Sequence, residues 1–286
     1  MFVEIQRPYC ALLLDAYGVF WGGNGVGLLP GAKEMMQQLV SQGKVVGILS
    51  NSSQIAQKEI DKLKNYGVVQ GTHYHFYLTS GQIAKDLVKN EALPFHTSQK
   101  KYWLSTPPHP KYSSPHLLFQ ESAFAESQNL EEADFIFASI PHIEGEDQTD
   151  PKLFESEVKK LATASLPMLC INPDRFAHEG LPARAVVRQG TIAKLYEALG
   201  GTVHYIGKPY PIAYKYAMQA FKPFGIEKAE EILMVGDTPE TDIRGANGFG
   251  MASLLVTETG MMKERIFSQN SLPPSDVPTH YAERFQ

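Results

Sequence analysis

Residues 10–18 read CALLLDAYG, in which an apolar run ends abruptly at Asp15 and a glycine follows at Gly18. A short apolar run bounded by polar residues is typical of a buried strand. A carboxylate at the end of such a strand can reach a phosphorus atom, while backbone N–H groups near the glycine hold the phosphate oxygens. The stretch therefore predicts a buried strand that presents Asp15 for chemistry at its carboxyl end.

Short apolar runs alternate with helical patterns on either side of a different middle region. Expected strands and helices alternate over 10–14, 32–42, 45–49, 55–64 and 74–79, and again over 203–206, 212–224, 232–235, 243–247 and 253–256. Strand and helix in alternation predict a parallel sheet flanked by helices. The fold expected is α/β, with a Rossmann-like core.

The middle of the chain has the character of an inserted domain. It contains a proline-rich loop at 105–116 and its own strand candidates at 101–104, 135–138 and 168–171. With 286 residues, the chain is long enough for about two domains at roughly 150 residues each. We therefore expect a catalytic core formed by residues 1–79 and 205–286, and an inserted α/β cap domain at 80–204 that selects the substrate.

Composition argues against two classes of partner. The formal net charge is -5 and the pI about 6.0, without the basic stripe that nucleic-acid-binding proteins carry. No apolar run approaches the roughly 20 residues needed to cross a bilayer, and the first residues do not resemble a signal peptide. Cys10 and Cys170 both fall in expected strands and predict free, buried thiols. Together these features predict a cytoplasmic protein that binds neither nucleic acid nor membrane.

Polar residues follow two further strands. Ser50 and Asn51 follow the strand at 45–49, and the strand at 232–235 runs into GDTPETD, which contains Asp237 and Asp242. Ligands of open α/β sheets lie outside the carboxyl ends of the strands, so these residues should meet Asp15 at one edge. Clustered carboxylates repel one another unless a cation intervenes, and Mg²⁺ suits such oxygen ligands. The pattern predicts phosphoryl transfer assisted by Mg²⁺.

Each of these signals has a simpler interpretation when taken alone. Asp15 suits a turn or helix cap, and Asp237 before Thr238-Pro239 suits a helix start. Lys208, in Gly207-Lys208-Pro209 after the strand at 203–206, is as a single residue more typical of a solvated surface lysine than of a catalytic one. The combination and its order, rather than any single residue, favour a catalytic site.

The ordered motifs resemble those of a known family. DAYG at 15–18, Ser50-Asn51, Gly207-Lys208-Pro209 and GDTPETD at 236–242 are similar, in order and spacing, to the four motifs of the haloacid dehalogenase superfamily of aspartate-nucleophile hydrolases. Asn172-Pro173-Asp174 and the later GTIA at 190–193 resemble its NagD-like subgroup, class IIA, whose cap lies between the second and third motifs. That subgroup includes phosphatases of sugar phosphates, nucleotides and pyridoxal phosphate. The resemblance spans nearly the whole chain.

The resemblance implies roles for the catalytic and metal-binding residues. Asp15 would be the nucleophile and a metal ligand. The Tyr17 carbonyl and Asp237 would be further ligands of Mg²⁺, and Asp242 would bind it through water. Lys208 would hold the phosphate and anchor the Asp15 carboxylate.

The remaining implied roles concern the substrate, expected to be a small phosphorylated metabolite. Gly18, Ser50 and Asn51 would bind the phosphate together with Lys208. Asn172 and Asp174 would lie where the leaving group enters. An exposed cap surface is compatible with a homodimer.

Tyr17 departs from the family pattern. Most phosphatases of the superfamily carry a second aspartate two residues after the nucleophile, as general acid and base, and this chain has Tyr17 there. DAYG is closer to the metal-free dehalogenases, which lack the acidic metal motif. Two alternatives to a phosphatase therefore stay open, a metal-free carbon–halogen hydrolase and a catalytically weak protein that binds a phosphate ligand.

Overall fold

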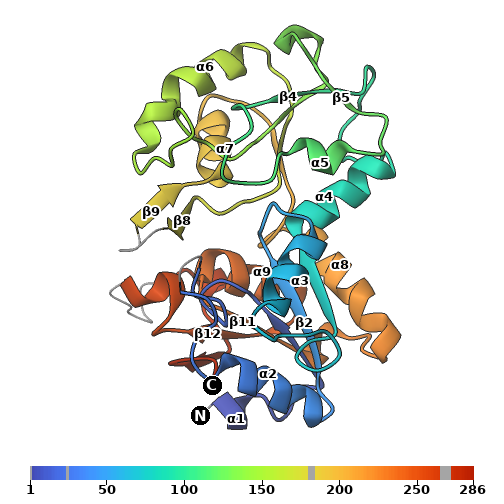
Figure 1. Cartoon of the computed structure of the whole chain (residues 1–286), viewed down its shortest axis with the longest axis vertical. Helices are drawn as coiled ribbons and strands as arrows, with labels where there is room; N and C mark the ends of the chain where they lie inside the picture. The colour runs from blue at the N-terminus through green and yellow to red at the C-terminus, as the bar shows by residue number, and fades with distance from the viewer. Residues whose placement is uncertain (1, 24–25, 180–183, 265–271) are drawn as a thin grey trace. The chain divides into compact units, whose positions relative to one another are not determined.

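The computed structural model describes residues 2–23, 26–179, 184–264 and 272–286 (Figure 1). They form two compact units. Of the described residues, the first unit takes those of Met1–Ser50, Ala56–Thr79 and Lys208–Gln286, and the second takes Asn51–Ile55 and those of Ser80–Gly207. The sequence predicted a single insertion at 80–204, whereas the second unit continues to Gly207 and also takes in the five residues that follow Ser50.

The first unit is built on a six-stranded parallel sheet in the order β13-β12-β11-β1-β2-β3. Its strands are β1 (Ala11–Leu14), β2 (Val45–Ser50), β3 (Phe76–Thr79), β11 (Ile232–Gly236), β12 (Ala252–Val256) and β13 (His280–Ala282). β1 and β11 are buried at every position, as expected for central strands of a sheet covered on both faces. The expectation for Cys10 was wrong, because β1 begins one residue later and Cys10 is exposed.

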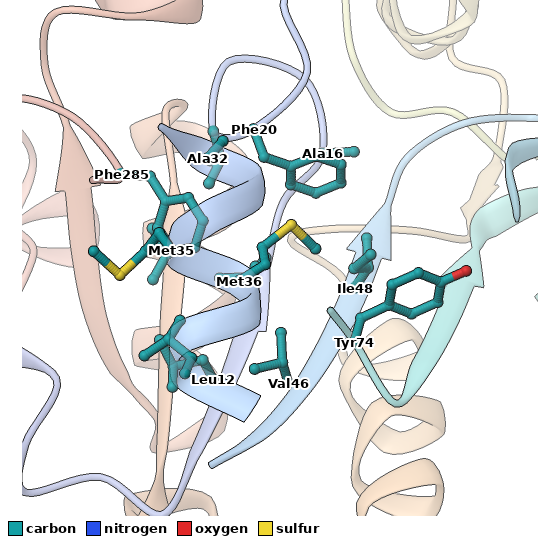
Figure 2. Close-up of a cluster of buried hydrophobic side chains, with 14 of the residues drawn as sticks. Leu12, Ala16, Phe20, Ala32, Met35, Met36, Val46, Ile48, Tyr74 and Phe285 are labelled. Atoms are coloured by element: carbon teal, nitrogen blue, oxygen red, sulfur yellow. The ribbon is translucent and has the colours of Figure 1, made fainter. Parts of the chain in front are cut away.

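Helices cover both faces of this sheet. The unit contains α1 (Phe2–Ile5), α2 (Ala32–Ser41), α3 (Ala56–Lys64), α8 (Pro211–Phe221), α9 (Arg244–Phe249), the 3₁₀ turns η3 (Lys222–Phe224), η4 (Ala229–Glu231), η6 (Gly260–Glu264) and η8 (Pro274–Asp276), and the π-helical turn η5 (Pro239–Ile243). Figure 2 shows Met36 of α2 on the side of the helix that faces Val46 and Ile48 of β2, and all three side chains are buried in one cluster. On the other face the ring of Phe221 in α8 lies 4.7 Å from that of Phe76 in β3.

The order of the strands creates a crevice beside β1. β2 and β3 lie on one side of β1, and the later strands β11, β12 and β13 lie on the other side. Leu14 at the end of β1 is in register with Ile48 of β2 and Val235 of β11, so the three strands end at one edge. In open α/β sheets, ligands bind at the carboxyl ends of the strands where the strand order reverses. Asp15 and Asp237 follow the two strands that meet there.

The second unit has a five-stranded parallel sheet of its own, in the order β10-β7-β6-β4-β5. The strands are β4 (Lys101–Leu104), β5 (Ala125–Glu126), β6 (Phe135–Phe137), β7 (Met168–Cys170) and β10 (Val203–Tyr205), and β8 (Phe176–Glu179) and β9 (Arg184–Val187) form an antiparallel hairpin. Its helices are α4 (Ser80–Lys89), α5 (His116–Phe119), α6 (Glu155–Thr163) and α7 (Gln189–Ala198), with 3₁₀ turns η1 (Leu130–Glu132) and η2 (Pro151–Phe154). The strand expected at 203–206 was assigned to the core, but β10 pairs with β7 and therefore belongs to the second unit.

The predicted fold class is confirmed. Both units are α/β, with parallel sheets and flanking helices. Within the described ranges of the chain, no helix is both long enough and apolar enough to span a membrane.

Candidate active site

Three carboxylates and one ammonium meet at the crevice of the first unit. Asp15 follows β1, Asp237 follows β11, Asp242 lies in the π-helical turn η5, and Lys208 begins the segment before α8. All four side chains are buried. One carboxylate oxygen from each aspartate lies within 4.8 Å of the other two. We refer to Asp15, Asp237, Asp242 and Lys208 as the carboxylate cluster.

Glycines allow the backbone to approach these carboxylates closely. Gly18 has φ +83°, which side-chain-bearing residues rarely adopt, and a Cβ there would lie 2.1 Å from Asp237 Oδ2. A Cβ on Gly236 would lie 2.2 Å from Cβ of Asp242. The glycines of DAYG and of GDTPETD are therefore required by the packing of the cluster itself.

Lys208 holds two of the aspartates. Its Nζ donates a hydrogen bond of 2.5 Å to Asp15 Oδ1 and lies 2.8 Å from Asp242 Oδ1 in an ion pair. Burial alone would lower the pKa of Lys208, but the adjacent Asp15 and Asp242 carboxylates raise it above its usual range. Lys208 therefore stays cationic and fixes the orientation of the Asp15 carboxylate.

The cluster carries more negative charge than one lysine neutralises. Burial raises the pKa of Asp15 well above its ordinary value, Lys208 opposes this shift, and Asp242 and Asp237 add to it. Burial, followed by repulsion from Asp242, raises the pKa of Asp237 to about 7. Both shifts mean that ionising all three carboxyl groups is unfavourable in the protein alone. A buried set of hard oxygen donors with surplus negative charge fits a divalent cation.

The aspartates differ in how far their oxygens are already engaged. Asp242 Oδ2 accepts hydrogen bonds from the N–H groups of Asp237 (3.1 Å) and Thr238 (3.0 Å), and its Oδ1 faces Lys208. Asp237 Oδ1 accepts from the Thr238 hydroxyl at 2.9 Å, and its Oδ2 accepts from the N–H of Met261 at 2.7 Å. Since each oxygen can accept more than one bond, both residues stay available to a cation. Compared with Asp237, Asp242 has more contacts with charged and amide donors.

Ser50 and Tyr17 lie in the same unit as the cluster. Ser50 is buried at the end of β2 and hydrogen-bonds the hydroxyl of Tyr77. Tyr17 is 37% exposed, and its hydroxyl accepts a 3.2 Å hydrogen bond from Lys62 Nζ. Lys62 in turn forms an ion pair with Glu59, one turn back in α3. The family's usual acid–base position is therefore occupied by a phenol that a lysine contacts.

The other predicted substrate residues meet one another in the second unit. Asn51 Nδ2 donates a 2.9 Å hydrogen bond to Asp174 Oδ1, and the N–H of Asp174 donates a 3.0 Å bond to Asn172 Oδ1. The segment after β2 and the segment after β7 are thus joined through the three residues predicted to bind the substrate.

One part of the site was not predicted from the sequence. Thr259 donates its hydroxyl to the Gly18 carbonyl at 2.5 Å, and the N–H of Met261 in η6 binds Asp237. Thr259 belongs to the polar stretch at 257–260 that begins directly after β12, and Met261 follows this stretch. A polar stretch after a strand was the signal used for Asp15, Ser50 and Asp237, and the same signal would have found this turn.

Stability without a divalent cation should depend on pH through Asp237. Because the folded protein raises the pKa of Asp237 from 3.8 to about 7, it binds this proton more tightly than the unfolded chain does. That contribution to stability is complete below the ordinary carboxyl pKa and is lost as pH rises through about 7. We expect wild type to lose stability relative to Asp237→Asn over this range in a chelator, and added Mg²⁺ to reduce the loss. Denaturant unfolding of both proteins at several pH values measures the difference in their free energies of unfolding. If this difference did not change with pH, the prediction would be contradicted.

Two family models match the chain. The haloacid dehalogenase-like hydrolase model covers residues 12–109, and a HAD-hydrolase-like model covers residues 205–284. Asp15 and Ser50 lie in the first match, and the other three members of the carboxylate cluster lie in the second.

Solved structures share the fold over nearly the whole chain. A haloacid dehalogenase-like hydrolase from Brucella suis has a TM-score of 0.79 at 21% identity, covering 99% of this chain and 97% of that one. A possible sugar phosphatase from Cytophaga hutchinsonii has a TM-score of 0.74 at 22% identity, covering 99% and 96%. Glycerol phosphate phosphatase from Mycobacterium tuberculosis, in complex with magnesium, has a TM-score of 0.67 at 20% identity, covering 98% and 76%.

A curated relative is more similar over a short stretch. The cardiolipin synthase (CMP-forming) / mitochondrial hydrolase fusion protein of Schizosaccharomyces pombe is 48% identical over 62 residues, which is 20% of this chain. The match spans only 10% of that protein's length. The assignment to a family therefore rests on the two family models, whose matched residues together include every residue of the carboxylate cluster. The resemblance of the motifs is confirmed, and the chain belongs to the haloacid dehalogenase superfamily of hydrolases.

Proposed function

We propose that the protein is a Mg²⁺-dependent phosphatase that hydrolyses a small phosphate monoester through an aspartyl-phosphate on Asp15. The observation that carries the proposal is the buried Asp15 carboxylate, oriented by Lys208 and flanked by two further carboxylates. The possible sugar phosphatase and the glycerol phosphate phosphatase that share its fold support a phosphate ester as substrate.

Asp15 would act as the nucleophile. Lys208 binds Oδ1, so Oδ2 is the oxygen proposed to attack phosphorus. Attack forms the bond between Asp15 and phosphorus and breaks the ester bond, and the alcohol leaves with a proton from solvent or from a side chain. Water then attacks the aspartyl-phosphate and releases inorganic phosphate and the free carboxylate. Ser50 and the ammonium of Lys208 would hold the phosphate oxygens during both steps.

Asp15 and Asp237 would hold Mg²⁺, together with the Tyr17 carbonyl, and Asp242 would contact it through water. Both oxygens of Asp242 are engaged by Lys208 and two amides, which suits this outer position. When bound, Mg²⁺ neutralises the repulsion among the carboxylates and between them and the phosphate. The magnesium complex of the Mycobacterium tuberculosis relative supports the choice of ion.

The second unit would select the substrate. Asn51, Asn172 and Asp174 form a hydrogen-bonded group there and are proposed to contact the leaving group. The expected partner is a small phosphorylated metabolite.

Replacing the nucleophile should remove turnover without unfolding the protein. We expect Asp15→Asn to lower phosphatase activity by about 10³-fold or more, because an amide is a poor nucleophile of similar shape. Asp61→Asn is the matched control, since Asp61 is exposed on α3. Activity and circular dichroism of both variants provide the test. A folded Asp15→Asn protein with substantial activity would exclude Asp15 as the nucleophile.

The two other aspartates should differ in their effect on metal affinity. Asp237→Asn removes a charged direct ligand and should raise the Mg²⁺ concentration for half-maximal activity more than Asp242→Asn does. Titrations of activity against Mg²⁺, started from chelator-treated protein, measure this concentration for both variants.

The chelator-treated protein also tests the dehalogenase alternative, because release of halide from a haloacid without metal would replace the phosphatase proposal. In the Mg²⁺ titrations, an unchanged metal dependence of both Asp237→Asn and Asp242→Asn would contradict the assignment of the metal ligands.

Tyr17 should restrict the leaving groups that the enzyme accepts. A general acid contributes a factor of about 10² to 10⁴ in rate, and a phenol with an ordinary pKa of about 10 is a weaker acid than a carboxyl group. Wild type should therefore hydrolyse p-nitrophenyl phosphate much faster than a sugar phosphate, and Tyr17→Asp should selectively raise the rate on the sugar phosphate. The readout is the ratio of the two rates at saturating Mg²⁺. Comparable rates in wild type would mean that another residue supplies the proton.

A further inference from the structure

The turn that follows β12 contacts the carboxylate cluster and the DAYG segment. The hydroxyl of Thr259 donates a 2.5 Å hydrogen bond to the carbonyl of Gly18, and the N–H of Met261 donates a 2.7 Å bond to Asp237 Oδ2. We refer to residues 259–261 as the 259–261 turn. None of its residues has a role in the proposed reaction, although one of them touches a proposed metal ligand directly.

Gly260, in the middle of this turn, lies against the Asp237 carboxylate. A Cβ on Gly260 would lie 1.8 Å from Asp237 Oδ2, and its φ of +57° is one that side-chain-bearing residues rarely adopt. The same Cβ would lie 2.6 Å from the Cα of Gly18, whose own added Cβ would lie 2.1 Å from Asp237 Oδ2. Two glycines thus pack against one oxygen of Asp237, and neither position has room for a side chain.

Other contacts hold the turn itself in place. The N–H of Thr257, just before it, donates a 3.0 Å hydrogen bond to the carbonyl of Ala282 in β13. The side chain of Met262, just after it, is buried in a cluster with Ile243 of η5 and Leu255 of β12. The turn is therefore attached to the sheet on one side and to the π-helical turn of the site on the other.

Asp237 needs such a partner because its neighbours repel it. Ionised carboxylates that share a site disfavour one another, and the terminal torsion of an aspartate is broad, so repulsion would rotate the Asp237 carboxylate away from the cluster. The N–H of Met261 opposes this rotation, since a hydrogen bond from an amide to an ionised carboxylate is charge-assisted. Partners that orient metal ligands in this way contribute about 10- to 100-fold to metal affinity.

We propose that the 259–261 turn is a positioning element for metal binding. Its N–H at Met261 and its glycine hold the Asp237 carboxylate, and its threonine holds Gly18, which adjoins the Tyr17 carbonyl. Both proposed ligands are then in place before the ion binds. This role rests on the proposed function for the identity of the ion, Mg²⁺.

Gly260→Ala tests the contact with Asp237. The new Cβ would displace the Asp237 carboxylate or the turn, so we expect the Kd for Mg²⁺ to rise about tenfold or more. Gly225→Ala is the matched control, because Gly225 also has a left-handed φ, +77°, but an added Cβ there meets nothing within 4 Å. The measurement is calorimetric titration of Mg²⁺ into the chelator-treated full chain without substrate, with circular dichroism to compare folding. A Kd raised equally by both variants would assign the change to backbone strain and overturn the proposal.

Substitutions of Thr259 test the second contact without placing a new side chain against Asp237. Thr259→Val removes the hydroxyl with little change in shape and should raise the Kd for Mg²⁺, whereas Thr259→Ser keeps the hydroxyl and should restore the wild-type value. If the residue only packed through its methyl group, Thr259→Ser would instead be the weaker binder. That order, or an unchanged Kd in Thr259→Val, would contradict the positioning role.

The activity of the same proteins separates this role from the proposed function. Phosphatase activity of Gly260→Ala should recover at saturating Mg²⁺, because the turn acts through the metal ligands and Asp15 is unchanged; activity that stays low would contradict the role. A wild type that binds Mg²⁺ more tightly than Gly260→Ala but hydrolyses no phosphate ester would remove the proposed function and leave the positioning role. A wild type that is active with Mg²⁺, while Gly260→Ala binds the ion as tightly or more tightly, would overturn the positioning role alone. If wild type bound no Mg²⁺, both would be overturned.

Discussion

The first unit depends on the burial of three carboxylates around one ammonium. Lys208 pairs with Asp15 and Asp242, the N–H groups of Asp237 and Thr238 donate to Asp242 Oδ2, and the N–H of Met261 donates to Asp237 Oδ2. Buried charges are tolerated only when paired and hydrogen-bonded, and this set retains surplus negative charge even so. The raised pKa values of Asp15 and Asp237 express that surplus. A site in this state favours a cation.

The two parallel sheets share one topological feature. In each unit a parallel sheet begins with a strand that later strands flank on both sides, β1 in the first and β4 in the second. The crevice at β1 and β11 holds charged groups, and the crevice at β4 and β6 holds neutral ones.

The sequence predicted the centre of the candidate site because its residues follow apolar strands. Asp15 and Asp237 come directly after a strand and Ser50 ends one, and parallel strands in register bring such positions to one edge. The pairing of Lys208 with both Asp15 and Asp242 was only partly foreseen, because the direction of a long side chain depends on tertiary packing. The contact between Lys62 and Tyr17 was not foreseen, since no periodic pattern joins α3 to the segment after β1.

The boundaries of the fold were the least predictable part. An apolar run at 203–206 suits a strand in either sheet, and only the pairing of β10 with β7 decides between them. Cys10 adjoins β1 in sequence and shares its apolar character, yet it lies outside the sheet and is exposed. An apolar pattern predicts that a strand is present. Which strands pair with it, and at which residues it begins and ends, depend on tertiary contacts that the pattern does not show.

The central claim is that Asp15 forms a covalent bond to phosphorus. Its most direct test is mass spectrometry of the enzyme quenched in acid during turnover of p-nitrophenyl phosphate with Mg²⁺, followed by peptide mapping. The account predicts one added phosphoryl group on the peptide that contains Asp15, accumulating because Tyr17 is a poor base for the hydrolysis step. A phosphoryl group on another residue, or turnover with no phosphorylated enzyme at any time point, would contradict it.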